Sequence, residues 1–271
     1  CAYCGQAARY HTGISVHGLL PVEQVVAHAE KAKVAGATRF CMAAAWRSVR
    51  DNCDFERVLT MVRAVNALGL ETCCSLGMLT ATQADKLKDA GLHAYNHNLD
   101  TSSGYYGQII STRQLKDRLD TLANVQAAGI RVCCGGIIGL GERIEDRIDL
   151  LTMLANLDPH PESVPINALV RVKGTPLENL SKVDAWELVR MVATVRIVIP
   201  RAMVRLSAGR LEMTEAEQAM CFLAGANSIF TGEQRKLLVT PNPGIGDDLQ
   251  LLGRLGLKPK PAPEENKTPA V

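Results

Sequence analysis

The feature of this sequence that most constrains its fold is a regular alternation between short apolar runs and longer amphipathic segments. The apolar runs are typical of buried strands, and the amphipathic segments, several of which end in Ala-Gly or Leu-Gly, are typical of helices. The predicted strands span residues 39–46, 71–77, 94–100, 131–139, 163–170, 203–209 and 228–232. The predicted helices span residues 21–36, 55–68, 82–90, 112–128, 145–157, 184–198 and 215–224. Strands that alternate with helices along a chain predict a parallel sheet covered by helices.

The number of predicted strands falls one short of a closed α/β barrel. Seven strands are predicted, whereas a (β/α)8 TIM-type barrel has eight. We therefore expect residues 1–257 to form such a barrel with its first strand upstream of Cys1, so that the chain is an amino-terminal truncation of a longer protein. Residues 258–271 are rich in proline and lysine and show no apolar periodicity, which predicts a disordered tail.

Charge and cysteine content argue against several classes of protein. Basic and acidic residues are interspersed and leave a net charge of +2, which predicts binding neither to nucleic acid nor to a membrane surface. No apolar run approaches the roughly 18 residues of a spanning helix. Nine cysteines are dispersed through a chain without a recognisable secretory signal, so we expect free thiols in a reducing compartment. We expect a cytoplasmic location, with a mitochondrial one as the alternative because a leader could precede Cys1.

Two cysteines at the start of the chain form a C-x-x-C pattern in which Cys1 and Cys4 flank Tyr3. This pattern serves zinc sites, dithiol redox pairs and iron-sulfur loops alike. A zinc site needs a second pair of ligands at similar spacing, and no such pair follows in the sequence. A thioredoxin-like dithiol would follow a strand, and none is predicted before Cys1. The sequence therefore favours an iron-sulfur loop.

Polar residues alternate along one predicted strand. Side chains at every second position share a face, so Asn96, Asn98 and Asp100 face one way. His97 and Leu99 face the other way. The outer face of a barrel strand packs under helices, where unsatisfied polar groups are costly, so the lumen suits the polar set better. We interpret these residues as ligand contacts; the alternative is a polar network that satisfies itself inside the core.

The same alternation orients the cysteines. The residues of each vicinal pair, 73–74 and 133–134, must face opposite ways, so at most one of each pair enters the lumen. Cys41 lies in the middle of another predicted strand, and Arg205 is a cation in an apolar strand that needs an anionic partner when buried. Three thiolates and one arginine could thus converge from four strands. The alternative is that these cysteines fill space, because free cysteine is among the most buried residue types.

A glycine-rich turn with the sequence Gly-Gly-Ile-Ile-Gly-Leu-Gly-Glu spans residues 135–142. It has no Gly-Lys-Ser/Thr of a Walker loop and lacks the third glycine of the motif G-x-G-x-x-G. Glycines at the end of a strand let a flat ligand approach the backbone, and Ile137 could pack on such a ligand. An ordinary strand-to-helix turn is the alternative.

Several longer strings carry a resemblance to a known family. They lie at residues 1–4, 38–42, 95–101, 162–167, 204–210 and 224–230, and include Tyr-Asn-His-Asn-Leu-Asp-Thr and Val-Arg-Leu-Ser-Ala-Gly-Arg. In these strings the chain resembles the biotin synthases, a family of radical S-adenosylmethionine enzymes with a (β/α)8 barrel. The resemblance runs from Cys1 to about Leu257 and covers nearly everything except the tail.

The resemblance implies two iron-sulfur clusters. Cys1 and Cys4 match the second and third cysteines of the family's C-x-x-x-C-x-x-C motif, and the first would lie upstream. Such thiolates hold a [4Fe-4S] cluster that binds S-adenosylmethionine. The ligands implied for a second cluster, [2Fe-2S], are Cys41, Cys73, Cys133 and Arg205. The remaining cysteines, at positions 53, 74, 134 and 221, match no ligand position.

The resemblance also implies residues that contact the cofactor and the substrate. Those implied for S-adenosylmethionine are Tyr3, Asn98, Asp100, Arg118, Gly135, Ile137, Gly139 and Glu142. Within this set, Asn98 and Asp100 correspond to contacts with the ribose and Arg118 to a contact with the methionine carboxylate, while the glycine turn lies on the adenine side. The residues implied to line a pocket for dethiobiotin are Asn96, Asn98 and Asn167.

The activity implied by the resemblance is that of a sulfurtransferase. Sulfur would be inserted into dethiobiotin to give biotin, in the last step of biotin biosynthesis, with the cofactors rather than side chains as the catalytic groups. Electrons would come from a flavodoxin or ferredoxin, and the family suggests a homodimer. Two alternatives stay open: a related radical enzyme with another product, and a non-catalytic truncated barrel fragment that binds at most one metal centre.

Overall fold

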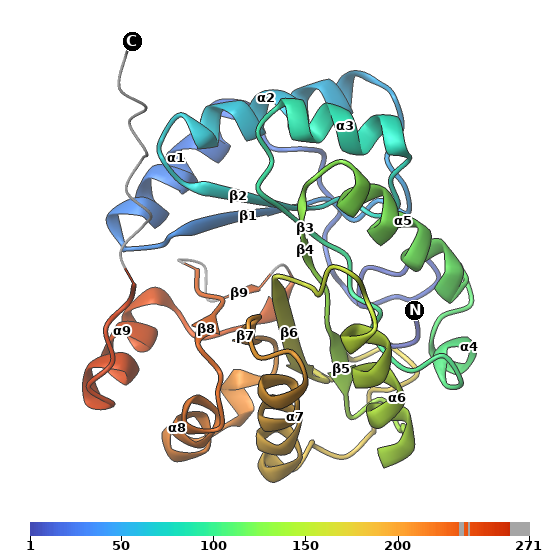
Figure 1. Cartoon of the computed structure of the whole chain (residues 1–271), viewed down its shortest axis with the longest axis vertical. Helices are drawn as coiled ribbons and strands as arrows, with labels where there is room; N and C mark the ends of the chain where they lie inside the picture. Colours follow the sequence, from blue (N-terminus) through green and yellow to red (C-terminus); the bar gives the residue numbers. More distant parts are fainter. Residues whose placement is uncertain (233–235, 238, 261–271) are drawn as a thin grey trace.

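A curved parallel sheet forms the centre of the computed structural model, which describes residues 1–232, 236–237 and 239–260 (Figure 1). Its strands are β1 (Arg39–Ala43), β2 (Glu71–Ser75), β3 (Ala94–Asn96), β4 (Arg131–Cys133), β5 (Gly136–Ile138), β6 (Ser163–Ala168), β7 (Met203–Leu206) and β8 (Ser228–Ile229). The order across the sheet is β1-β2-β3-β4-β6-β7-β8, and β5 also pairs with β6. Within the described residues β1 and β8 do not pair with each other, so the sheet is a half-barrel.

Seven helices follow the order that the sequence predicts and cover the outside of the curved sheet (Figure 1). The described helices are α1 (Val22–Val34), α2 (Cys53–Asn66), α3 (Ala81–Asp89), α4 (Tyr106–Ile109), α5 (Leu115–Ala127), α6 (Ile144–Ala155), α7 (Ala185–Val198), α8 (Glu215–Leu223) and α9 (Ile245–Arg254), of which α4 and α9 were not predicted. Side-chain caps fix several starts: Thr80 and Thr214 form capping boxes at α3 and α8. The expected TIM-type α/β architecture is confirmed. Among the described residues, no helix is long and apolar enough to cross a membrane.

The predicted strand at residues 131–139 is divided into β4 and β5. The division falls at Gly135, where a Cβ atom would lie 1.9 Å from the carbonyl oxygen of Pro165. Only glycine allows the two backbones to approach this closely. Cys134 N–H donates to the Ser163 carbonyl at 2.9 Å, so the chain still follows β6 while its pleat is interrupted.

Near the carboxyl end, the structure contains elements that the sequence pattern did not predict. A two-stranded antiparallel ladder pairs β9 (Lys236–Leu237) with β10 (Thr240–Pro241), and α9 follows it. Helix α9 contains Gly246 and Gly253, which lower its intrinsic helix propensity, and its stability depends on tertiary packing instead. Of the predicted tail at 258–271, residues 261–271 lie outside the described residues. The single domain over residues 1–257 stays a prediction.

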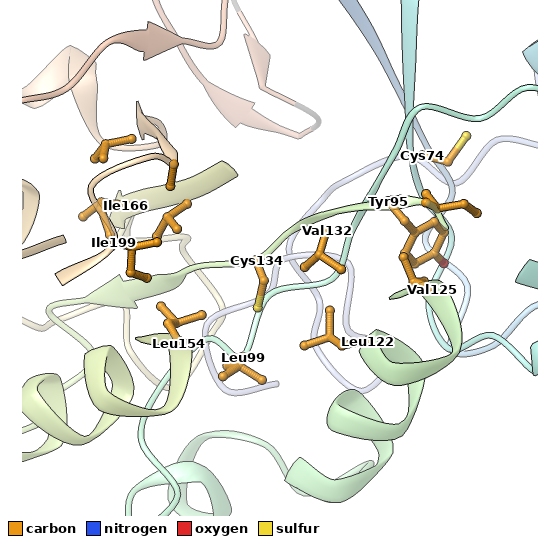
Figure 2. Close-up of a cluster of buried hydrophobic side chains, with 14 of the residues drawn as sticks. Cys74, Tyr95, Leu99, Leu122, Val125, Val132, Cys134, Leu154, Ile166 and Ile199 are labelled. Atoms are coloured by element: carbon orange, nitrogen blue, oxygen red, sulfur yellow. The ribbon is translucent and has the colours of Figure 1, made fainter. Parts of the chain in front are cut away.

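The hydrophobic core lies between the sheet and its helices, on what we call the outer face of the sheet. Cys74, Tyr95 and Val132 point into it from three strands (Figure 2), Val204 belongs to the same core from a fourth, and all four are at most 3% exposed. The helices contribute apolar residues such as Leu122, Val125 and Leu154, which pack against the strand residues. Because these strand positions point into the core, the side chains at the alternate positions point to the opposite face of the sheet, which we call the inner face.

Replacing Leu154 by alanine should test this core. Leu154 is fully buried on α6, whereas Ile148 on the same helix is 59% exposed. We expect Leu154→Ala to lower the free energy of unfolding by about 2–5 kcal/mol, because it removes packed atoms and leaves a cavity. Ile148→Ala should change it by less than about 0.5 kcal/mol. Urea unfolding followed by circular dichroism measures both, and equal losses would contradict the orientation of α6.

Candidate functional site

Three cysteines project from the inner face of the sheet, on β1, β2 and β4. Cys41 on β1 is in register with Cys73 on β2. On β3, Ala94 is in register with Cys73, and Asn96 lies two positions further along the same strand. Asn96 is in turn in register with Cys133 on β4. Since residues in register or two apart share a face of the sheet, all these side chains face inward. Cys74 and Cys134, by contrast, lie in the outer core.

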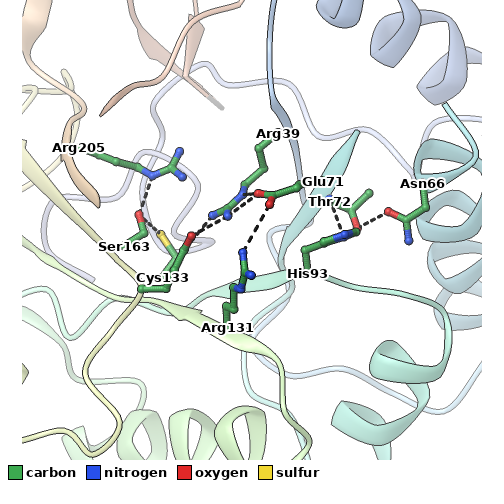
Figure 3. A network of polar contacts seen from close by, with 10 residues as sticks. Arg39, Asn66, Glu71, Thr72, His93, Arg131, Cys133, Ser163 and Arg205 are labelled. Atoms are coloured by element: carbon green, nitrogen blue, oxygen red, sulfur yellow. Dashed lines mark hydrogen bonds and ion pairs between the residues drawn. The ribbon is translucent and has the colours of Figure 1, made fainter. Parts of the chain in front are cut away.

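Arg205 shares this inner face from β7. Cys133 is in register with Ser163 on β6, Ser163 with Met203, and Arg205 follows Met203 by two positions. The Arg205 Nε donates to Ser163 Oγ at 2.6 Å, and the Cys133 thiol donates to the same oxygen at 3.4 Å (Figure 3). Ser163 and Cys133 are fully buried, and Arg205 is 6% exposed. The buried serine therefore joins the arginine to the thiol.

Cys41 and Cys73 form a second contact at the edge of the sheet. A hydrogen bond with Cys73, together with the positive charges of Arg205 and Arg39, lowers the pKa of Cys41 to about 7. The same hydrogen bond, followed by burial, raises the pKa of Cys73. One thiol of the pair thus ionises readily, and a thiolate is the form that ligates metals. Burial also raises the pKa of Cys133, although Arg205 and the hydrogen bonds of Ser163 and Asn96 act in the opposite direction.

The spread of these thiols decides which metal centre they fit. In the part of the chain that the structure describes, no three His, Cys, Asp or Glu side chains gather as a site for a metal ion. Cys73 and Cys133 are separated by β3, and neighbouring strands lie about 4.8 Å apart. A cluster that holds two irons offers different metal atoms to different ligands, so donors spread over several strands suit it better than a single ion.

Below the cysteines, an ion-pair network closes the amino-terminal end of the inner face. Arg39 binds Glu71 at 2.6 Å and Glu162 at 2.8 Å through its Nη2, and its side chain is 4% exposed (Figure 3). Arg131 binds the same Glu71 at 3.4 Å. Arg39 and Glu71 each lie two positions before a cysteine of the inner face. The network thus forms a charged floor beneath the thiols, and sequence reasoning missed it because ion pairing between distant strands leaves no local pattern.

A buried polar cluster lies beyond the opposite ends of the strands. Asp100 accepts hydrogen bonds from Tyr3 Oη at 2.8 Å and Arg118 Nη2 at 2.5 Å. Arg118 also donates to the Asn98 carbonyl at 2.5 Å and to Tyr106 Oη at 2.8 Å. Burial lowers the pKa of Arg118, but Asp100, Tyr3 and Tyr106 together raise it above its ordinary value, so the guanidinium keeps its proton. The structure therefore brings together four of the predicted cofactor residues and adds Tyr106, which the sequence did not single out.

The cysteine loop packs beside this cluster. Ala2 N–H donates to the Ile109 carbonyl of α4 at 2.8 Å, and Cys4 N–H donates to Cys1 at 3.3 Å in a tight turn. Cys1 and Cys4 are both half-buried. Cys1, Tyr3 and Ile137 pack against one small apolar cluster around Tyr106 and Leu140. The predicted cysteine loop and the glycine turn are thus neighbours in space.

Asparagine side chains connect the thiols to the glycine turn. Asn96 Nδ2 donates to Cys133 Sγ at 3.3 Å and to Asn98 Oδ1 at 3.4 Å, and the latter oxygen also accepts from Gly135 N–H at 3.1 Å. The side-chain amide of Asn167 instead binds backbone groups: it donates to the Gly136 carbonyl at 3.0 Å and accepts from Ala208 N–H at 3.2 Å.

Glu142 stabilises the glycine turn from within. Its carboxylate accepts from the N–H groups of Gly139 and Leu140 at 2.9 and 2.6 Å and from Arg147 Nε at 2.8 Å. Gly139 has a φ of 90° and a Cβ there would lie 2.2 Å from Val183, so a side chain is excluded. Because two backbone N–H groups of the turn bind this carboxylate, Glu142 shapes the turn.

Two protein-family models match adjacent stretches of the chain. The model of the Radical SAM superfamily matches residues 1–154, and that of the Biotin and Thiamin Synthesis associated domain matches residues 165–258. The first stretch contains the cysteine loop, Asp100 and Arg118, and the second contains Arg205 and α9. The chain belongs to the radical SAM superfamily.

Curated relatives narrow this assignment. The biotin synthase of Cytophaga hutchinsonii is 58% identical over 271 residues, which cover 100% of this chain and 80% of that protein. The biotin synthase of Gloeobacter violaceus is 59% identical over 260 residues, which cover 96% of this chain and 81% of that protein. With this identity and coverage, the chain belongs to the biotin synthase family.

Solved structures of more distant proteins share the fold. Methylornithine synthase superposes with a TM-score of 0.77 at 19% identity, covering 96% of this chain and 79% of that one. A maturase of the [FeFe]-hydrogenase superposes with a TM-score of 0.77 at 17% identity, covering 95% of this chain and 60% of that one. At such identities the likeness concerns the fold alone.

The charged floor predicts an acid-dependent contribution to stability. Burial raises the pKa of Glu71, but the hydrogen bond and charge of Arg39 outweigh this, and the pKa lies below its ordinary value of 4.5. A carboxyl group whose pKa is lower in the folded protein stabilises the fold above the unfolded pKa, and this is lost as pH falls through the folded pKa. Glu71→Gln should therefore lower Tm at neutral pH and match the unsubstituted protein in acid.

Thermal unfolding of both forms, recorded from about pH 7 down to about pH 3, spans the carboxyl titration. Glu30→Gln, on the exposed side of α1, is the control and should leave Tm unchanged throughout. A Tm difference for Glu71→Gln that persists undiminished in acid would contradict a role for its charge.

Proposed function

We propose that this protein is a biotin synthase that inserts sulfur into dethiobiotin to form biotin. The observation that carries the proposal is the set of inner-face residues Cys41, Cys73, Cys133 and Arg205, which a radical enzyme without a second cluster would not need. Asn96 extends the argument, because it contacts Cys133 while lying beside the polar cluster around Asp100. A sulfur source and a cofactor site would then face one shared space.

The cofactor assignments follow from the two groups of residues. Cys1 and Cys4 would hold a [4Fe-4S] cluster together with a cysteine upstream, and the inner-face set would hold a [2Fe-2S] cluster. When bound, these clusters and S-adenosylmethionine supply the radical that opens an unactivated C–H bond and the sulfur that replaces its hydrogen. The chain itself supplies position, charge and exclusion of water.

Several residues have specific tasks in this proposal. Arg118 would hold the methionine carboxylate, and Asp100 and Asn98 the ribose. In the structure Asp100 is already bound by Tyr3 and Arg118, so the carboxylate and the guanidinium are fixed before any ligand arrives. Fixed partners lower the ordering cost of binding. The turn stabilised by Glu142 would present backbone groups on the adenine side, with Ile137 packing nearby, while Asn96, Asn98 and Asn167 would line the pocket for dethiobiotin.

The proposal extends to partners and location. An electron donor of the flavodoxin or ferredoxin kind would reduce the first cluster, and the enzyme would work as a homodimer in the cytoplasm. The donor and the homodimer rest on the family resemblance, and the location rests on the dispersed cysteines, with a mitochondrial one as the alternative.

Cys133→Ala should separate sulfur insertion from radical formation. The substitution removes one ligand of the proposed second cluster and leaves the ligands of the first cluster unchanged. The amount of biotin formed should therefore fall at least about 100-fold. Formation of 5'-deoxyadenosine from S-adenosylmethionine should persist. Cys134→Ala, next in the chain but in the outer core, is the matched control and should keep both products.

The measurement is an anaerobic assay by mass spectrometry with reconstituted iron and sulfide, dithionite, S-adenosylmethionine and dethiobiotin. It uses the natural protein, including any residues that precede Cys1. Equal loss of both products in Cys133→Ala would refute the separation of roles, and absence of biotin from the unsubstituted enzyme would refute the proposed function.

Arg118→Lys should weaken the binding of S-adenosylmethionine. Lysine keeps a positive charge opposite Asp100 but loses the planar fork that holds a carboxylate in two places, so affinity should fall about tenfold. Equilibrium dialysis with the reconstituted protein measures this directly. Arg254→Lys, whose partner is the exposed Glu215, is the control. Unchanged affinity in Arg118→Lys would count against its assignment.

A further inference from the structure

Arg205 is in contact with an aromatic ring from the neighbouring strand. Its Cζ lies 5.1 Å from the centroid of the Phe230 ring. Phe230 comes directly after β8, where Arg205 is in register with Ser228 two positions earlier. A guanidinium over an aromatic face gains electrostatic attraction and flat contact at once. The ring therefore contacts the cation that shares Ser163 with Cys133.

The hydrogen bonding of Arg205 does not by itself fix the orientation of its guanidinium. Its Nε donates to Ser163 Oγ at 2.6 Å. Within the described residues, neither terminal nitrogen of the guanidinium has a hydrogen-bond partner. A single N–H···O bond leaves rotation about its own axis free, whereas contact with a flat ring fixes the plane of the guanidinium. The orientation of Arg205 thus depends on Ser163 and Phe230 together.

The backbone of Phe230 is itself anchored. Its carbonyl accepts from Arg210 Nη1 at 3.1 Å and from Asn242 Nδ2 at 3.0 Å. Arg210 is 1% exposed, donates to Gln218 at 3.1 Å, and forms a buried ion pair with Asp248 of α9. This arrangement, which we call the carboxyl-terminal clasp (Arg210, Gln218, Asn242 and Asp248), holds the Phe230 backbone at a defined place.

We propose that Phe230 is a positioning residue for Arg205, and that the carboxyl-terminal clasp sets the place of its ring. Phe230 does not act on the substrate; it fixes the plane in which the guanidinium meets the inner-face thiols. This role rests on the proposed function, because it assigns Arg205 to the second cluster. The stacking itself is a property of the chain and can be tested without metal.

The first arm of the test uses metal-free protein labelled with ¹⁵N-arginine. Protons over the face of a ring are shifted upfield in NMR spectra, so the Arg205 Hε resonance should move downfield in Phe230→Leu, which keeps apolar volume but has no ring. Phe230→Tyr should restore the upfield position. Phe222→Leu, which removes a ring packed against the outer core, is the matched control and should leave Arg205 unchanged.

The second arm uses the reconstituted enzyme and measures biotin relative to 5'-deoxyadenosine. Phe230→Leu should lower this ratio about fivefold, the effect expected of a lost cation–π contact, and leave 5'-deoxyadenosine unchanged. Phe230→Tyr should restore the ratio, and Phe222→Leu should preserve it. The absorption spectrum should also change in Phe230→Leu in the bands of the second cluster.

The outcomes separate the two hypotheses. An unmoved Hε resonance in Phe230→Leu, or a moved resonance with unchanged ratio and spectrum, overturns the positioning role. A ratio that Phe230→Tyr does not restore overturns it as well, because the ring would then not be the cause. If the unsubstituted enzyme makes no biotin, the proposed function fails, and the NMR arm then decides on the stacking alone.

Discussion

The hydrogen-bonded register of the parallel sheet is the constraint on which the rest of this structure depends. Side chains alternate across a strand, so a register that aligns Cys41 with Cys73 and Asn96 with Cys133 determines the face of every neighbour as well. One face of the sheet packs its apolar side chains against the helices, and the thiols and polar groups lie on the other face. A shift by one residue on any strand would exchange these roles.

Buried arginines show how the fold treats charge in different places. Arg39, Arg118 and Arg210 are all deeply buried, and each is bound by a carboxylate: at the floor of the inner face, beside the cysteine loop and against α9. Burying a cation without such a partner is costly. Arg205 differs, because among the described residues it is bound by a serine hydroxyl and a ring, with no carboxylate. Among these four arginines, Arg205 is thus the one whose charge no carboxylate of the described residues balances.

The polar groups of the candidate site form two clusters on the inner face of the sheet, and hydrogen bonds connect them. The thiols lie between the ion-pair floor and the asparagines, and the asparagines lead to the turn at Gly135 and the cluster around Asp100. Asn96 and Cys133 lie on paired strands, Gly135 lies between β4 and β5, and Arg118 reaches Asp100 from α5. The pairing of β3 with β4 therefore fixes the thiols relative to the asparagines, and α5 and the cysteine loop fix Asp100 at the other end.

Some of this could be predicted from the residues alone. Apolar runs and helical periodicity gave the βα order, because those patterns are local, and alternation along single strands predicted that Cys73 and Cys74 face opposite ways. The division at Gly135 could not be predicted, since it depends on the approach of Pro165 from another strand. Helix α9 was missed for a related reason: its glycines weaken the local signal, and the Asp248–Arg210 ion pair that holds it is a distant contact.

The sequence by itself determined the class of fold, the family and the identity of the donors available at the site. Only the tertiary structure decided how those donors are connected: that Ser163 joins Arg205 to Cys133, that Asp100 is held by Tyr3 and Arg118, and that Phe230 lies against the guanidinium. The physical reason is that secondary structure follows from spacing over a few residues, whereas these contacts join positions that come together only when strands pair in register.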